Sequence, residues 1–103
     1  MSAPYFSAHV TQRWQQRVGR HTSVGRAFAR SQYIGQAKLR TRPTRRGREL
    51  CFGYQYDRWV FVVAYRPGPV VLTVWPVAWW AQKARQYAHW WATTYHQQEE
   101  DRA

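Results

Sequence analysis

The sequence predicts an α+β fold in which two N-terminal helices pack on a four-stranded antiparallel meander, followed by a long aromatic C-terminal helix. The strongest indication is the stretch from Trp59 to Pro76. Its two arms are rich in β-branched and aromatic residues and flank Pro67-Gly68, a pair that favours a type II turn. Helical periodicity on both sides of the strand-rich middle is the second indication. A chain of 103 residues has room for one core of a single sheet and a few helices.

The register of this hairpin decides where a site can lie. If Arg66 faces Pro69 across the turn, Val62 pairs with Thr73. The other face is then apolar, and we expect helices to cover it: Trp59, Phe61, Val63, Tyr65, Val70, Leu72 and Val74. The face with Thr73 is the better place for a site because it carries a hydroxyl. A slip of one residue would exchange the faces of one arm, so this assignment depends on the register.

The first helix is expected from about Ala8 to Val18, with Ser7 as its N-cap and Gly19 at its end. At ~100° per residue two stripes lie side by side, an apolar one of Val10, Trp14 and Val18 and a cationic one of His9, Arg13 and Arg17. The helix can therefore bury one stripe on the sheet and hold the other at the edge of a groove. The alternative is that the cationic stripe simply lies in solvent.

The next segments continue the helix and strand pattern. A second helix is expected from Thr22 or Ser23 to Gly35, with its apolar side formed by Val24, Ala27, Phe28, Ser31 and Ile34 and with Arg26 and Arg30 opposite. Two strands follow, over Gln36 to Arg42 and about Arg48 to Tyr54. In the first of these, Ala37 and Leu39 are expected to point inward and Lys38 and Arg40 outward.

The C-terminal helix is expected over about Val77 to Gln97, and the acidic run Glu99 to Asp101 after it is expected to fray because it opposes the helix dipole. The expected organisation is one domain, with a core over 5–76, the helix over 77–98 and a tail over 99–103. We expect Trp80, Tyr87 and Trp91 to be buried against the sheet. The alternative is that this aromatic surface contacts a partner.

Charge is distributed very unevenly. The chain has 16 Lys and Arg against 5 Asp and Glu, for a net charge of +11. Of these cations, 11 lie between Arg13 and Arg48, a region without an acidic residue. A surface of one sign attracts polyanions, so nucleic acid or another polyanion is the predicted partner. Codon bias toward Arg is an alternative source of the cations, but it does not explain the missing acids. The predicted contacts are Arg26, Arg30, Lys38, Arg40, Arg42, Arg45 and Arg46.

Several classes of site are disfavoured by composition. The lone Cys51 allows neither an internal disulfide nor a cysteine-based zinc site. No Gly-rich phosphate loop, nucleophile elbow or metal-binding cluster is present, and carboxylates are too few for a two-metal nuclease. We therefore expect no metal and no cofactor. The N-terminus lacks a signal-like pattern and the longest apolar stretch is broken by Pro69 and Pro76, so a cytoplasmic location without a membrane is expected.

RNA can be cleaved without a metal ion. Its 2′-hydroxyl attacks the adjacent phosphate when a protein supplies a proton acceptor, a proton donor and positive charge for the transition state. His, Arg, Tyr and Thr side chains are sufficient for these roles, and the sequence contains all of them.

A resemblance enters at His9. The run from Ser7 to Gly19 resembles the opening helix of a domain family of otherwise unknown function with the pattern Ser-x-His-x-x-x-Arg-x-x-x-Arg-x-Gly. Three further segments resemble that family, namely a second helix ending in Gly at Tyr33 to Gly35, a Gly-containing strand at Cys51 to Tyr54, and a Val-Thr-Val strand at Leu72 to Trp75. The family is similar to the barnase, EndoU, colicin and RelE superfold of small metal-independent ribonuclease toxins.

The resemblance covers roughly Tyr5 to Pro76 and implies a function. It implies that His9, Arg13 and Thr73 are catalytic, that Arg17 is a supporting nucleic-acid contact, and that a neutralising antitoxin or a host protein is a partner. A toxin-like endoribonuclease is therefore one hypothesis. The other is a non-catalytic module that binds nucleic acid or a host protein through the Arg-rich face and the Trp-rich helix.

Overall fold

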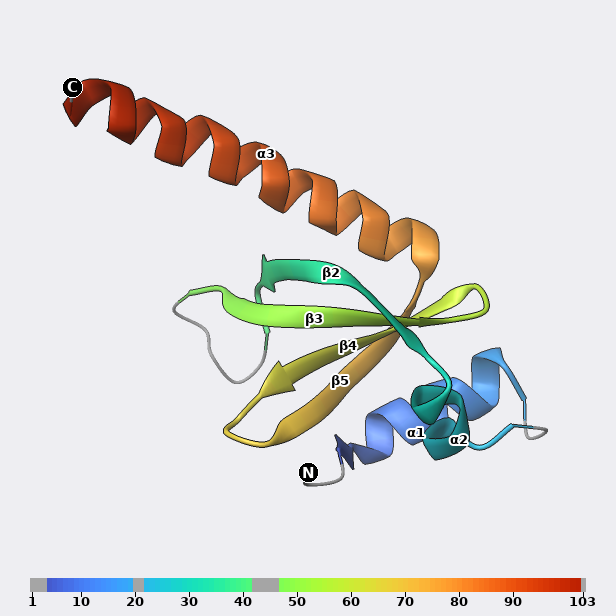
Figure 1. The fold of residues 1–103 in the computed structure, drawn as a ribbon. Helices are drawn as coiled ribbons and strands as arrows, with labels where there is room; N and C mark the ends of the chain where they lie inside the picture. Colours follow the sequence, from blue (N-terminus) through green and yellow to red (C-terminus); the bar gives the residue numbers. More distant parts are fainter. Residues whose placement is uncertain (1–3, 20–21, 42–46, 103) are drawn as a thin grey trace.

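Five strands form one sheet in the order β1-β5-β4-β3-β2, in a computed structural model that describes residues 4–19, 22–41 and 47–102, with side chains up to Thr93. Strands β2 to β5 form the predicted antiparallel meander. Strand β1 adds a short parallel strand at the edge of β5, so the sheet has five strands instead of four. The elements are β1 (Tyr5–Phe6), α1 (Ala8–Arg17), α2 (Val24–Ala29), β2 (Gln32–Leu39), β3 (Glu49–Tyr56), β4 (Trp59–Tyr65), β5 (Pro69–Pro76) and α3 (Val77–Arg102) (Figure 1).

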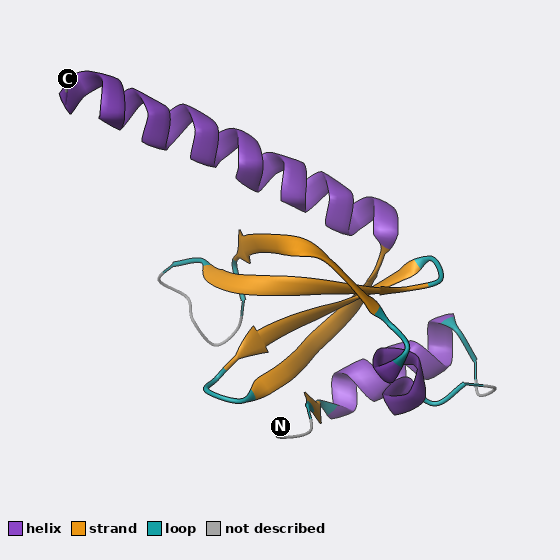
Figure 2. Cartoon of the chain, viewed as in Figure 1, coloured by secondary structure: helices purple, strands orange, loops and turns teal. Residues whose placement is uncertain are grey.

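Helices α1 and α2 cover one face of the sheet, and α3 lies against the other (Figure 2). Trp14 anchors the first layer, because its ring stacks on Phe61 at 5.1 Å between centroids and its Nε1 donates a 2.7 Å hydrogen bond to the carbonyl of Thr22. The predicted apolar stripe of α1 is confirmed, since Val10 and Trp14 are both buried. The other buried residues of this layer are Ala27, Val63, Val71 and Val74.

The first turns of α3 pack closely on the opposite face. Trp80 is only 3% exposed. Its indole lies directly over Gly53 of β3, where an added Cβ would stand 2.6 Å from Cε2 of the indole. A side chain at this position would overlap the ring, so glycine is what allows the close approach. The rest of this core consists of Ala37, Leu39, Cys51, Val60, Val62 and Ala64.

The turn of the central hairpin differs from the prediction. Tyr65 pairs with Pro69, so the connection is Arg66–Gly68 and Arg66 does not face Pro69 as expected for a type II turn. Within the connection, the N–H of Arg66 donates a 2.8 Å hydrogen bond to the carbonyl of Gly68. The strands thus begin pairing one residue away from the expected register.

A bulge corrects this offset further along the strands. The register shifts between Val62 and Val63, so that Val63 pairs with Val71 while Val62 pairs with Thr73 as predicted. The extra residue in β5 exchanges the sheet faces of Val71 and Leu72. Val71, and not Leu72 as expected, packs under α1 and α2, whereas Leu72 packs in the core under α3.

The second helix is shorter than predicted. It ends at Ala29, and the stretch from Gln32 to Gly35, which was expected to continue it, belongs to strand β2. Tyr33 and Ile34 are aromatic and β-branched, types that favour a strand, and Ile34 is 38% exposed where burial was expected. Gly35 adopts a positive φ of 137° at an irregularity in the β2–β3 register. The segment Tyr33 to Gly35 is therefore not the helix end that the family resemblance implied.

Strand β2 begins and ends earlier than the predicted Gln36 to Arg42. Its alternation is as predicted, because Ala37 and Leu39 are buried while Lys38 and Arg40 are exposed. Lys38, and Arg40 just after the strand, therefore do not enter the core under α3 that Ala37 and Leu39 share.

Helix α3 runs past the end of the sheet (Figure 1). It continues through the acidic run to Arg102, beyond the expected end near Gln97. Trp80 is buried as predicted and Tyr87 is half-buried, but Trp91 is 47% exposed because the sheet does not extend beneath that part of the helix. Among the described residues, no helix is both long enough and apolar enough to cross a membrane.

Candidate functional site

His9 and Thr73 line the same cleft. This hollow of about 440 Å³, called the His9 cleft below, opens between the start of α1, the middle of β5 and the end of β2. Its lining residues are His9, Leu39, Arg40, Thr41, Val62, Leu72, Thr73 and Trp75. The site thus holds an imidazole, two hydroxyls and a guanidinium above an apolar floor.

The edge of the sheet brings His9 to this cleft. The short strand β1 pairs in parallel with β5, placing Phe6 beside Val71. The two strands run in the same direction. His9, shortly after Phe6, and Thr73, shortly after Val71, therefore lie toward the same end of this strand pair. Ser7 lies between β1 and α1 as the N-cap, and its Oγ accepts a 3.2 Å hydrogen bond from the N–H of Val10. Because this cap begins the helix at Ala8, His9 lies in the first turn, where its side chain is exposed at the sheet edge.

Arg17, at the other end of the cationic stripe, is engaged with the protein itself. Its Nη1 donates a 2.9 Å hydrogen bond to the carbonyl of Val74. Its Cζ lies 6.0 Å from the ring centroid of Trp59 and 5.9 Å from that of Trp79. Arg17 therefore connects α1 with β4, β5 and the first turn of α3, which gives it a structural role in addition to the nucleic-acid contact that was predicted.

Arg13 lies one helical turn after His9 and is exposed, but it is not among the residues that line the cleft. Arg40 lines the cleft instead. The sequence pattern had placed Arg40 among the nucleic-acid contacts only, because nothing in a strand pattern shows which loop or helix end a side chain will meet.

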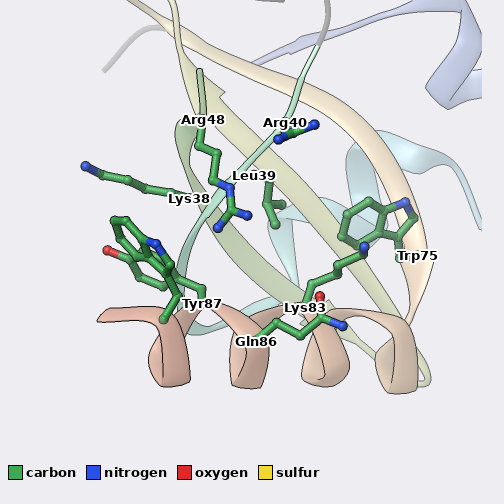
Figure 3. A pocket seen from close by; sticks show the side chains of 9 residues that line it. Lys38, Leu39, Arg40, Arg48, Trp75, Lys83, Gln86 and Tyr87 are labelled. Carbon is green, nitrogen blue, oxygen red and sulfur yellow. The ribbon is translucent and has the colours of Figure 1, made fainter. Parts of the chain in front are cut away.

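A second hollow of about 440 Å³ lies beside the first. This basic groove shares Leu39, Arg40 and Trp75 with the His9 cleft and extends from there along α3. Figure 3 shows Lys83 extending from α3 toward Trp75, and Arg48 extending toward α3. The lining residues are Lys38, Leu39, Arg40, Arg48, Trp75, Lys83, Gln86, Tyr87 and Trp90.

The two hollows have a strongly positive character. Of the carboxylates whose side chains are described, Asp57 lies 4.0 Å from Arg58, and Glu49 is bound by Arg66. The hydrogen bond from Arg66 is the main reason that the pKa of Glu49 is lowered. Thr41 of the His9 cleft also donates its hydroxyl to Glu49. The one carboxylate that contacts a cleft residue is thus already neutralised.

The predicted nucleic-acid contacts are not on one face. Lys38 and Arg40 line the basic groove, whereas Arg26 and Arg30 belong to α2, and Arg30 lines a separate hollow that contains Asp57. Arg42, Arg45 and Arg46 lie outside the described residues.

The predicted contacts did not include several groove residues, among them Arg48, Lys83, Tyr87 and Trp90. The spacing of the last three along one side of α3 was a usable signal, because residues four and then three positions apart share a helix face. Whether these side chains line a groove depends on where α3 packs, and the sequence pattern does not specify that packing.

The described residues contain no group of three or more His, Cys, Asp or Glu side chains able to hold a metal ion. The chain has no match among protein-family models, curated proteins or solved structures.

Proposed function

We propose that the protein is a metal-independent, toxin-like endoribonuclease that cleaves RNA in the cytoplasm. The observation that carries the proposal is that His9 and Thr73, which come from α1 and β5, line one cleft together with Arg40. These side chains provide a proton acceptor, a hydrogen-bond donor to the phosphate and a positive charge, and water supplies the proton for the leaving oxygen in phosphodiester cleavage by the RNA's own 2′-hydroxyl.

In this reaction His9 accepts the proton of the 2′-hydroxyl while the 2′-oxygen attacks the adjacent phosphorus. The bond from phosphorus to the 5′-oxygen breaks, and that oxygen takes up a proton from water. The products are a 2′,3′-cyclic phosphate and a 5′-hydroxyl. Arg40, and Arg13 from the next turn of α1, stabilise the charge that accumulates on the phosphate oxygens, and Thr73 donates a hydrogen bond that orients them.

The test is cleavage of total RNA by purified protein in excess EDTA. We expect cleavage to persist in EDTA and to fall by ~100-fold or more in the variant His9→Ala, the usual scale for losing a general acid or base. Binding of an RNA analogue should stay nearly unchanged, because His9 acts on the transition state. Cleavage that EDTA abolishes, or that His9→Ala leaves intact, would contradict the proposal.

The alternative function is a non-catalytic module that binds nucleic acid or a host protein. It is favoured by one observation, the exposed indoles of Trp79, Trp90 and Trp91 on α3. Protein that binds RNA without cutting it in the same assay would support this second function. A neutralising partner belongs only to the toxin-like proposal.

A further inference from the structure

We propose that the basic groove binds the single-stranded RNA segment that flanks the scissile phosphate. The inference rests on the proposed function, because it places a strand of the same RNA beside the His9 cleft. The two hollows share Arg40 and Trp75, so a strand with one phosphate near His9 continues into the groove without leaving the protein surface.

The charge of the groove fits a phosphate backbone. Lys38 and Arg40 at the end of β2, Arg48 just before β3 and Lys83 on α3 line it, and no carboxylate among the described side chains does. All four cationic side chains are exposed to solvent. Cations that gather in a hollow with no acid among its lining residues repel one another until an anion enters, so a polyanion is the expected occupant.

The aromatic residues of the groove indicate bases as well as phosphates. Tyr87 and Trp90 of α3 stack with their ring planes 25° apart and their centroids at 6.1 Å. The Cζ of Arg48 lies 5.8 Å from the Trp90 ring centroid. Trp75 lies where the groove meets the His9 cleft. Rings alternating with cations are the arrangement that binds unpaired strands, because each exposed base has a face for stacking and each phosphate a cation.

This arrangement also predicts a preference for single strands. The bases of a duplex are stacked on each other, so they cannot stack on Tyr87 or Trp90. The groove volume of about 440 Å³ is within the range of small-molecule sites, ~300–1,000 Å³, and suits a short unpaired segment better than a helix of RNA. Helix α3 therefore contributes one wall of the substrate site, although it lies outside the segment on which the family resemblance rests.

The charge arm of the test compares two double variants with the same change in net charge. The probe is a fluorescein-labelled single-stranded oligonucleotide carrying 2′-O-methyl groups, which cannot be cleaved, and anisotropy measures its affinity at several salt concentrations. The groove variant is Arg48→Glu with Lys83→Glu, and the control is Arg58→Glu with Arg85→Glu, two exposed arginines that do not line the groove. We expect the groove variant to lose ~10-fold or more in affinity and about 1.4 in the slope of log affinity against log salt, as for two lost phosphate contacts.

The aromatic arm compares neighbouring tryptophans of α3. Trp90→Leu should weaken binding of the single strand by about 5-fold or more, the lower range for one lost base–aromatic stack. Trp91→Leu should change it less than 2-fold, because Trp91 does not line the groove. A 2′-O-methyl duplex should bind more weakly and should not respond to Trp90→Leu.

Equal losses in the groove variant and its control, or equal effects of Trp90→Leu and Trp91→Leu, would overturn the proposal. The outcome separates this inference from the proposed function. If the protein does not cleave RNA but the groove variants lose affinity, the ribonuclease proposal is wrong and the proposal that the groove binds single-stranded RNA is supported. If cleavage persists in EDTA while the groove variants bind normally, the groove proposal fails alone.

Discussion

Nη1 of Arg17 donates a 2.9 Å hydrogen bond to the carbonyl oxygen of Val74, the residue that follows Thr73 in β5. The bond joins the C-terminal end of α1 to the uncovered edge of the sheet. At the other end of α1, strand β1 pairs with the same strand β5. The helix is thus fastened to β5 near both ends, and His9 lies between the two attachments.

Arg17→Met should destabilise the fold by about 1–3 kcal/mol, because it removes a hydrogen bond from a charged donor and the contacts with two indoles. Urea denaturation measures the change. The control is Arg13→Met, which removes the same charge from an exposed position on the same helix and should alter stability by less than about 0.5 kcal/mol. Equal effects of the two variants would show that Arg17 does not fasten α1.

Thr73→Val should lower the rate of RNA cleavage by about 10- to 1,000-fold, since it removes one hydrogen-bond donor to the phosphate in the transition state. Valine has nearly the same shape, so the fold and the affinity for an uncleavable oligonucleotide should persist. Single-turnover kinetics measure the rate. Thr11→Val removes a hydroxyl that is bonded to the carbonyl of Ser7, outside the cleft, and should leave the rate unchanged. A normal rate for Thr73→Val would exclude the assigned role.

Gly53→Ala should destabilise the protein by about 1–3 kcal/mol, because the new methyl group would lie 2.6 Å from the Trp80 ring. The same substitution at Gly25, in helix α2, meets no atom within 4 Å and should stabilise by about 0.5–1 kcal/mol through helix propensity. Thermal unfolding distinguishes the two. In a Trp80→Leu background the cost of Gly53→Ala should decrease, since the ring that it meets is gone.

The ion pair between Glu49 and Arg66 predicts a loss of stability in acid. The Arg66 hydrogen bond, followed by weaker contributions from Thr41, lowers the pKa of Glu49 below its ordinary value of 4.5, although burial opposes the shift. A carboxyl with a lowered folded-state pKa contributes stability that is complete above the unfolded pKa and is lost as pH falls through the folded pKa.

The stability of the protein, measured by urea denaturation, should therefore decrease below about pH 4.5. Glu49→Gln should cost about 1–3 kcal/mol at neutral pH, because both partners are half-buried and Arg66 loses a charged hydrogen-bond acceptor. The variant should differ less from the parent protein at pH 3 than at pH 7. A constant difference across this range would indicate that the pair contributes no linkage.

Local patterns in the sequence predict the elements whose signals are themselves local. The N-cap Ser7 and the stripe of Val10 and Trp14 define α1, and the alternation of Ala37 and Leu39 defines the buried side of β2. Two local signals misled, namely the apolar spacing that suggested a helix up to Gly35, and Pro67-Gly68, which suggested a type II turn. In both, pairing with a neighbouring strand outweighed the local preference.

The pairing of Val62 with Thr73 was predicted, but the bulge that moves Leu72 to the face under α3 was not. A bulge depends on contacts between strands, which no pattern within one strand reveals.

The sequence by itself determined the composition of the site: a surplus of cations, few carboxylates, a histidine at the start of a capped helix and a threonine in a strand. The tertiary structure alone decided which of these groups meet. Parallel pairing of β1 with β5 brings His9 to the cleft that Thr73 lines, and packing of Trp80 on Gly53 positions α3 so that Lys83 and Arg48 line one groove. These residues come together through contacts between segments far apart in the chain. The burial of a shared core selects those contacts, and no local pattern specifies that core.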